Sequence, residues 1–246
     1  MKIIVQKTDA KNTTQFLTDF ITTNYINGIS LNIAITKDNK IVSFNIPAND
    51  QSITKTINQS TLTELKNYEI VELEIILTEL ERRNITKDIY INLSPIQTGT
   101  LTDENIIQVT DRLNNYISLV KNIVENHNSL NLKIHSVNRN LIQIAKSKIK
   151  TIPLGFVIYG LDLNFIDVDY YVITMNIFND AIIDQLLKKE KTVLLYINSD
   201  YYLSYVYNHF LGKDSTPYLN ETIKKLGIIT NYPEITNIVL NKPPIS

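Results

Sequence analysis

The sequence predicts an α/β protein that folds as a single (β/α)₈ TIM barrel. Short runs of β-branched residues alternate along the chain with longer segments of helical periodicity. Eight such runs follow one another in strand-then-helix order, the number that this barrel requires. The length of 246 residues is typical of one such barrel, and no Pro-, Gly- or Ser-rich linker divides the chain. We therefore expect one barrel domain over residues 1–246, with a doubly wound open sheet as the alternative fold.

The strands and helices are expected where the hydrophobic period changes between two and 3.6 residues. The strands are residues 2–5, 29–36, 89–93, 132–135, 154–159, 171–174, 192–197 and 227–230. Helices are expected at residues 11–25, 72–83, 102–126, 138–148, 179–189 and 199–210, with another short helix before the last strand.

A small insertion is expected after the second strand. The turn at Asp38 and Asn39 leads into a returning strand at residues 40–45, which forms a hairpin with the second strand. Residues 46–60 are polar and turn-rich, so they are expected to form a surface loop. The insertion of hairpin and loop therefore covers about residues 37–60.

The composition excludes several classes of function. Lysine and arginine (24) nearly balance aspartate and glutamate (25), which argues against nucleic-acid binding through phosphate contacts and against a polybasic membrane anchor. The absence of cysteine excludes disulfides, thiolate nucleophiles and sulfur-based zinc sites. No apolar stretch is long enough to span a membrane, and the first apolar run is too short for a signal peptide. We therefore expect a cytoplasmic protein.

Polar residues lie at or near the carboxyl ends of the predicted strands, where TIM barrels carry their functional sites. Almost none of them is ionisable, so they predict a neutral polar pocket that takes a small polar or phosphate ligand. The candidate pocket residues are Gln6, Lys7, Ser30, Asn32, Asn45, Asn92, Ser94, His135, Asn198 and Asn231.

Several blocks of the sequence resemble one enzyme family in the same order along the chain. Residues 28–45, GISLNIAITKDNKIVSFN, resemble the hallmark stretch of the glycerophosphodiester phosphodiesterases, in which Gly-Ile-Glu-Leu-Asp runs into Thr-Lys-Asp-Gly and ends in Phe-His-Asp. Residues 227–233, GIITNYP, are similar to the family's Gly-Ile-Ile-Thr-Asp-Tyr-Pro. Weaker matches lie at residues 61–66, 73–77, 91–94 and 195–198. The resemblance thus spans essentially the whole chain.

The resemblance implies a TIM barrel with the chemistry of a metal-dependent phosphoric diester hydrolase of lipid metabolism. Members of that family use Ca²⁺ or Mg²⁺ and release glycerol 3-phosphate from deacylated phospholipid headgroups. The three metal-binding carboxylates of the family correspond here to Ser30, Asn32 and Asn92. The two catalytic histidines correspond to Gln6 and Asn45.

Two further functional positions of the family are also changed. The arginine after the first histidine corresponds to Lys7, and the phosphate-binding lysine corresponds to Ser94. Hard divalent cations are held mainly by carboxylates, and amides do not transfer protons at neutral pH. The sequence therefore predicts no bound metal, no catalytic residue and an inactive, phosphodiesterase-like protein that acts as a binding or regulatory module.

Two alternatives remain open. The chain could be an active hydrolase of glycerophosphodiesters that uses other residues, such as His135 or Asp162. It could instead be a structural subunit that binds a protein partner, for example through a Tyr-rich segment. The tyrosines of that segment are Tyr201, Tyr202, Tyr205 and Tyr207.

The remaining ionisable candidates have ordinary structural interpretations. His135 is expected to be a hydrogen-bonded wall residue of the barrel, and His127 and His209 are expected at the surface on helix ends. Asp167 and Asp169, with Asp162, form an acidic run that is expected to be a solvated loop, although it could bind a cation.

Overall fold

The computed structural model describes residues 1–6, 13–44, 52–96, 106–160, 165–174, 177, 180–197 and 226–240. The strands are β1 (Lys2–Gln6), β2 (Gly28–Ile35), β3 (Ile41–Phe44), β4 (Val71–Glu72), β5 (Asp88–Leu93), β6 (Asn131–Ser136), β7 (Leu154–Ile158), β8 (Tyr170–Thr174), β9 (Thr192–Ile197) and β10 (Leu226–Thr230). The helices are α1 (Thr13–Thr22), α2 (Ser52–Gln59), α3 (Leu73–Arg82), α4 (Ile106–Asn126), α5 (Arg139–Lys148), α6 (Asp180–Lys188) and α9 (Pro233–Leu240).

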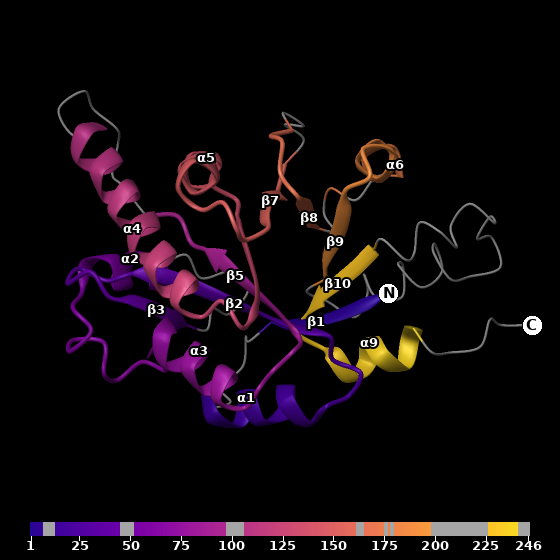
Figure 1. Cartoon of the computed structure of the whole chain (residues 1–246), viewed down its shortest axis with the longest axis horizontal. Helices are drawn as coiled ribbons and strands as arrows, with labels where there is room; N and C mark the ends of the chain where they lie inside the picture. Colours follow the sequence, from indigo (N-terminus) through magenta and orange to yellow (C-terminus); the bar gives the residue numbers. More distant parts are fainter. Residues whose placement is uncertain are drawn as a thin grey trace, which may run out of the picture.

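Eight parallel strands form a closed barrel with the helices around its outside (Figure 1). The strand order around the barrel is β1, β10, β9, β8, β7, β6, β5 and β2. Pairing of β1 with β2 closes the ring, with Ile4 opposite Gly28 and Gln6 opposite Ser30. The (β/α)₈ barrel and all eight predicted strands are thereby confirmed.

The hairpin strand β3 shares one edge of β2 with β1. The amino-terminal part of that edge, up to Ser30, pairs in parallel with β1. From Asn32 onward the same edge pairs antiparallel with β3, beginning at Phe44. The short strand β4 then pairs with β3. Asn32 therefore lies where the neighbour of β2 changes from one strand to the other.

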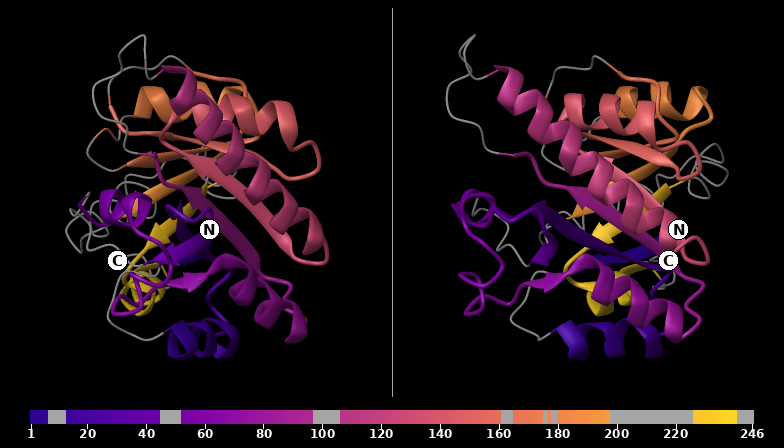
Figure 2. Two further views of the ribbon diagram at one scale, coloured as in Figure 1. Left: turned by 90° about the vertical axis from the view of Figure 1, so that its left-hand side faces the viewer. Right: turned by 60° about the vertical axis from the view of Figure 1, so that its left-hand side comes forward.

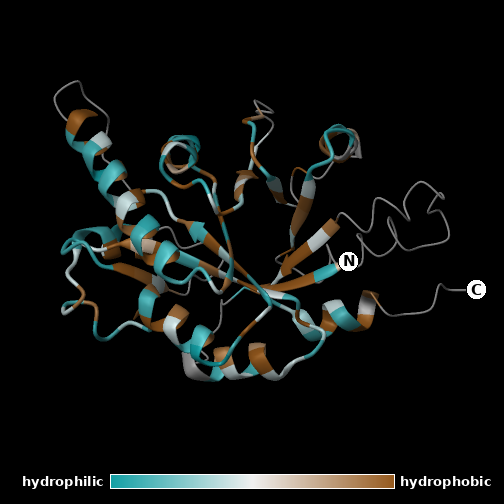
Figure 3. Ribbon diagram, in the orientation of Figure 1, coloured by the Kyte–Doolittle hydropathy of each residue, from teal (hydrophilic) through white to brown (hydrophobic). Residues whose placement is uncertain are grey.

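The main hydrophobic core lies between the strands and the surrounding helices. On β2, the alternate residues Ile29, Leu31 and Ile33 belong to this outer layer. Figure 2 shows α3 and α4 lying along the outside of the strands. Figure 3 colours much of the strands as hydrophobic, whereas the hydrophilic colour gathers on the helices and turns. The buried face of α3 consists of Leu73, Ile76, Leu77 and Leu80, which is one apolar stripe at helical spacing.

Large side chains fill the interior of the barrel. A separate buried cluster consists of Ile4, Tyr90, Tyr170, Val172, Leu194 and Ile229. Glycine makes space for the largest of them, because a Cβ atom on Gly155 would overlap the ring of Tyr170. The interior of the barrel is thus a packed core, and polar side chains lie at its two ends.

A buried carboxylate closes the amino-terminal end of the barrel. Asp88, the first residue of β5, accepts hydrogen bonds from the ammonium groups of Lys2 and Lys133, each at 2.8 Å, and from Asn131 Nδ2 at 2.7 Å. Burial raises the pKa of the Asp88 carboxyl, but the two lysines outweigh this effect and hold its pKa below the ordinary value. These interactions join the starts of β1, β5 and β6.

One segment differs from the sequence prediction. Residues 46–60 were expected to form a surface loop, but Ser52–Gln59 is the helix α2. Ile53 and Ile57 lie four residues apart, so they share one face of α2 and pack against Val42 and Phe44 of the hairpin. Ile57 is completely buried. The prediction was wrong because two isoleucines in a polar segment were sufficient to anchor a helix.

Two helices near the end of the chain differ from the sequence prediction or are not described. Helix α9 follows β10 and was not anticipated from the sequence. The predicted Tyr-rich helix at residues 199–210 lies outside the described residues. None of the described helices combines the length and the apolar character that a bilayer crossing requires.

Candidate functional site

The predicted pocket residues that the structure describes lie on or directly beyond barrel strands. Gln6 ends β1, Asn231 follows β10, and Ser94 follows β5. The other described members are Ser30 and Asn32 on β2, Asn92 on β5 and His135 on β6. Lys7, Asn45 and Asn198 lie outside the described residues.

Three amide side chains from β1, β2 and β5 are joined by hydrogen bonds. Asn32 Oδ1 accepts a hydrogen bond from Gln6 Nε2 at 3.1 Å and a second from Asn92 Nδ2 at 2.8 Å. Asn32 and Asn92 are opposite each other in the register of β2 and β5. The structure therefore brings together three predicted residues that are distant in the sequence, with the Asn32 oxygen at the centre.

Ser30 lies on the same face of β2 as Asn32, because side chains two residues apart in a strand point the same way. The hydroxyl oxygen of Ser30 is buried and has no hydrogen-bond partner within the described structure, and the same is true of Gln6 Oε1. Only 1% of Ser30 and 9% of Gln6 is exposed. Two buried oxygens beside the amide group are thus left without donors.

Asn231 extends this polar group around the barrel to β10. Val5 pairs with Thr230, so the next residues, Gln6 and Asn231, lie on neighbouring strands at the same end. Burial raises the pKa of the Tyr196 hydroxyl on β9, and the nearby side chain of Asn231 partly offsets this effect. Asn231 Oδ1 itself is buried and lacks a partner among the described residues.

Sequence reasoning missed Tyr196 as part of this group. Tyr196 lies two residues after Leu194, which belongs to the buried cluster inside the barrel. Alternation along β9 therefore places both side chains on the inner face. The signal was present in the sequence, because an aromatic residue with a polar tip stands near the carboxyl end of a predicted barrel strand.

His135 faces the barrel interior. Its Nδ1 atom lies 3.1 Å from the hydroxyl of Tyr170, and its ring packs edge-on against the ring of Tyr170 and near that of Tyr90. Only 2% of His135 is exposed. Burial lowers the pKa of its imidazole to about 3, so His135 is neutral at physiological pH.

Ser94 is held by the backbone of the neighbouring strand. Its amide N–H donates to the carbonyl of Ile33 at 2.9 Å, which continues the pairing of β2 with β5 by one residue. The residue is buried. Ser94 therefore fixes the end of β5 immediately beyond the Asn32–Asn92 pair.

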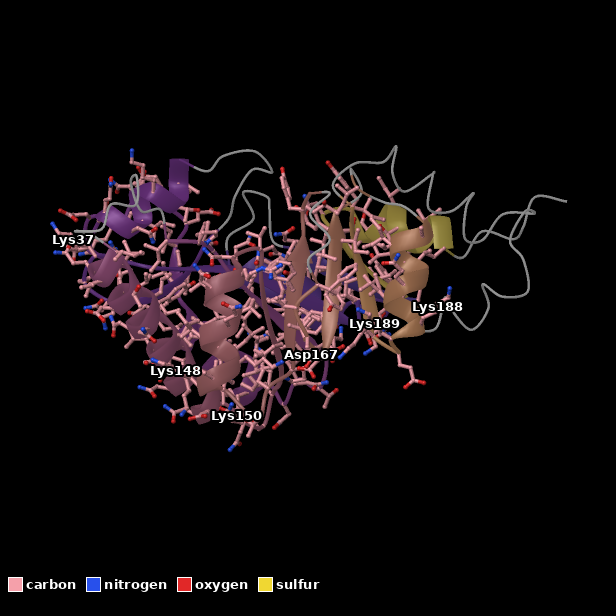
Figure 4. The ribbon with its side chains drawn as sticks, turned by 90° about the horizontal axis from the view of Figure 1, so that it is seen from above. Lys37, Lys148, Lys150, Asp167, Lys188 and Lys189 are labelled. Carbon is pink, nitrogen blue, oxygen red and sulfur yellow. The ribbon has the colours of Figure 1, made fainter. Side chains whose placement is uncertain are left out.

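The acidic run after β7 takes part in structural contacts. Asp167 pairs with Lys146 at 3.0 Å and with Lys191 at 3.3 Å. Figure 4 shows Asp167 between the labelled lysines near the ends of α5 and α6. Asp169 Oδ2 accepts a hydrogen bond from the backbone N–H of Leu154 at 2.7 Å.

Asp162 lies outside the described residues. The described residues contain no cluster of His, Cys, Asp or Glu suited to a metal ion.

His127 is buried, which contradicts the prediction that it lies at the surface. It directly follows α4, and only 6% of it is exposed. Its Nδ1 atom lies 2.8 Å from Glu81 Oε2, and Ser129 donates to the other oxygen of the same carboxylate. The contact with Glu81 holds the His127 side chain against α3. His127 is therefore buried, although a position on the surface was expected. His209 lies outside the described residues.

The described side chains at the carboxyl-terminal end of the barrel are therefore uncharged groups that can form hydrogen bonds. It presents amide and hydroxyl groups from β1, β2, β5, β9 and β10. Such groups bind a polar molecule by donating and accepting hydrogen bonds, but they neither carry charge nor exchange protons near neutral pH.

Comparison with known proteins gives a consistent result for the fold. No protein-family model matches the sequence, and no curated protein sequence does either. Solved structures are nevertheless similar over nearly the whole chain. A Silicibacter pomeroyi protein assigned to the glycerophosphoryl diester phosphodiesterases has 10% identity and a TM-score of 0.72, over 98% of this chain and 93% of that one.

Two further structures agree with this match. A glycerophosphodiester phosphodiesterase from Parabacteroides distasonis has 15% identity and a TM-score of 0.66, over 97% of this chain and 96% of that one. A phosphodiesterase from Oleispira antarctica, in complex with its product sn-glycerol-3-phosphate, has 14% identity and a TM-score of 0.68, over 98% and 97%. The chain therefore has the fold of the glycerophosphodiester phosphodiesterases, as its resemblance in sequence predicts.

Proposed function

We propose that this chain is a glycerophosphodiester phosphodiesterase-like protein that binds a small polar ligand at the carboxyl-terminal end of its barrel without hydrolysing a phosphodiester. The observation that carries the proposal is the pair of hydrogen bonds received by Asn32 Oδ1 from Gln6 and Asn92. Asn32 and Asn92 correspond to two metal-binding carboxylates of the family, and Gln6 corresponds to a catalytic histidine. All three now form one neutral amide group.

The residues at this site do not fit a divalent cation. Ca²⁺ and Mg²⁺ need several oxygen ligands, normally including carboxylates that offset the cost of dehydrating the ion. Ser30, Asn32 and Asn92 offer no formal charge. The Asn32 oxygen is moreover engaged by two N–H groups, whose positive ends would face an ion placed there. The chemistry of these side chains therefore argues against a catalytic step through a metal at this site.

None of the described pocket residues is suited to acid–base catalysis. An efficient general acid or base has a pKa near the working pH. Gln6 and Asn92 do not titrate, and the pKa of His135 is lowered to about 3 by burial. The His135 ring is further committed to Tyr170. These facts support ligand binding rather than hydrolysis as the function of this end of the barrel.

The neighbouring structures support a small polar molecule as the ligand. The Oleispira protein, which has the same fold over nearly the whole chain, holds sn-glycerol-3-phosphate. We propose that the present chain keeps a site for a molecule of about this size and acts as a binding or regulatory module.

A hydrolysis assay tests the proposal. The purified chain is incubated with glycerophosphocholine and Mg²⁺, Ca²⁺ or Mn²⁺, and release of glycerol 3-phosphate is measured beside the Oleispira phosphodiesterase as a positive control. We expect no turnover above the rate without protein. Turnover that increases with the amount of chain, and that a chelator abolishes, would contradict the proposal.

A further inference from the structure

Three buried oxygen atoms at the carboxyl-terminal end of the barrel have no hydrogen-bond partner within the described part of the chain. They are Gln6 Oε1, Ser30 Oγ and Asn231 Oδ1. Buried polar atoms in proteins are nearly always paired, because an unpaired one loses its bonds to water without replacement. Three such atoms at one end of one barrel therefore point to a molecule that completes them.

The three oxygens come from adjacent strands. Gln6 on β1 is opposite Ser30 on β2. Asn231, beyond β10, lies beside Gln6 on the other side, because Val5 pairs with Thr230. Neighbouring strands are about 4.8 Å apart, so an arc over three strands spans roughly 10 Å. That is the scale of a molecule with a few carbon atoms and several polar groups.

The type of these atoms determines what the molecule must offer. An amide oxygen only accepts hydrogen bonds, and Gln6 and Asn231 each leave an amide oxygen open. The partner must therefore bring O–H or N–H donors at several closely spaced positions. A phosphate at neutral pH brings mainly acceptor oxygens. No described residue of this group carries a positive charge that would attract it.

We propose that this end of the barrel binds a neutral polyhydroxylated molecule, a polyol or a sugar. Its hydroxyl groups donate to Gln6 Oε1, Ser30 Oγ and Asn231 Oδ1. A hydroxyl also accepts a hydrogen bond, so the same ligand can use the neighbouring amide N–H groups. The ring of Tyr196, which packs against the buried cluster inside the barrel, offers an apolar face to the carbon skeleton. This inference rests on the proposed function, since it names the ligand class of that site.

Calorimetric titration of the chain with glycerol, sorbitol, myo-inositol and glucose tests the inference, with inorganic phosphate and sn-glycerol 3-phosphate as comparison ligands. We expect saturable binding of at least one of the four neutral compounds and no saturable binding of phosphate. We also expect sn-glycerol 3-phosphate to bind no more tightly than glycerol. If none of the neutral compounds binds, or if the phosphorylated compound alone binds, the inference is overturned.

A pair of serine variants separates a ligand contact from a structural role. Ser30→Ala removes an unpaired hydroxyl, so we expect an unchanged or higher Tm without ligand and an affinity for the bound polyol about 5- to 10-fold weaker. Ser136 is the matched control, because its buried hydroxyl donates to the carbonyl of Leu93 and accepts the N–H of Asn138. Ser136→Ala is expected to lower the Tm and to leave the affinity unchanged.

The opposite pattern would contradict the inference. A large loss of Tm in Ser30→Ala with unchanged affinity would show that the hydroxyl is structural. Should Ser30→Ala not fold, Asn231→Ala provides the same test of affinity at a half-buried position. Hydrolysis of glycerophosphocholine would overturn the proposed function, whereas exclusive binding of sn-glycerol 3-phosphate would overturn only the choice of ligand class.

Discussion

Asn92 donates a hydrogen bond of 2.8 Å to Asn32 across the junction of β2 and β5. The two residues are opposite each other in the parallel register, on the inner side of the barrel. Gln6 reaches the same oxygen from β1. The neutral amide group is therefore part of the packing of the barrel's carboxyl-terminal end, and it has consequences for stability that can be measured.

The first prediction concerns the central oxygen of this group. Asn32→Leu keeps the approximate volume but leaves Gln6 Nε2 and Asn92 Nδ2 without their acceptor. We expect the free energy of unfolding to fall by about 1–3 kcal/mol, because buried donors are left unpaired. Urea denaturation measures the change.

Asn115 is a suitable control for this variant. It also makes a side-chain hydrogen bond between asparagines, to Asn39, but at the surface. Asn115→Leu should change the free energy of unfolding by no more than about 0.5 kcal/mol. Equal effects of the two substitutions would show that the buried amide group contributes nothing special to stability.

The second prediction is a pH dependence caused by His135. Its pKa is about 3 in the folded chain and about 6.5 in the unfolded chain, so below pH 6.5 the unfolded state binds the extra proton. Stability is therefore lost as the pH falls. Between pH 7 and pH 5 this single group should cost about 2 kcal/mol.

The variant His135→Phe removes that contribution. Its free energy of unfolding should change less between pH 7 and pH 5 than that of the wild-type chain, whatever its absolute stability. Denaturant melts at both pH values give the two differences. Equal differences in both proteins would mean that the buried imidazole does not titrate as described.

The third prediction concerns the space inside the barrel. A Cβ atom on Gly155 would overlap the ring of Tyr170, so Gly155→Ala should destabilise the chain by about 1–3 kcal/mol through overpacking. Gly160→Ala is the matched control, since a Cβ atom there meets nothing within 4 Å. Thermal unfolding of the two variants should show a lower Tm for the first only. A normal Tm for Gly155→Ala would contradict the packing described for Tyr170.

The fourth prediction concerns the opposite end of the barrel. Asp88→Asn removes the charge that Lys2 and Lys133 share, and we expect a loss of about 1–3 kcal/mol at neutral pH. Because the folded state lowers the pKa of Asp88, its contribution is complete above the unfolded value of about 3.9 and is lost as the pH falls. The difference between wild type and variant should therefore shrink in acid. A difference that stays constant below pH 4 would speak against an ionised Asp88.

Much of the barrel could be predicted because its strands are short apolar runs separated by helices of clear period. Parallel strands end at the same edge of the barrel, so several predicted site residues could be placed together at that end. These residues are Gln6, Ser30, Asn32 and Asn92. What the sequence could not provide was the direction of each hydrogen bond. The Asn32 oxygen accepts two hydrogen bonds because of the register of β1 and β5 relative to β2, and no local sequence pattern encodes that register.

The errors have a common physical origin. Helix α2 was taken for a loop because most of its residues are polar, and its stability comes from the contact of Ile53 and Ile57 with the hairpin. His127 was placed at the surface because it follows a helix, but Glu81 from another helix binds it. In both cases a tertiary partner distant in the sequence decided the outcome.

Calorimetric titration of the chain with Ca²⁺ and Mg²⁺ at neutral pH tests the central claim most directly. The account predicts no saturable heat at millimolar ion concentrations, because Ser30, Asn32 and Asn92 supply no carboxylate. Saturable binding that Asn32→Leu weakens would place an ion at the amide group and contradict the account.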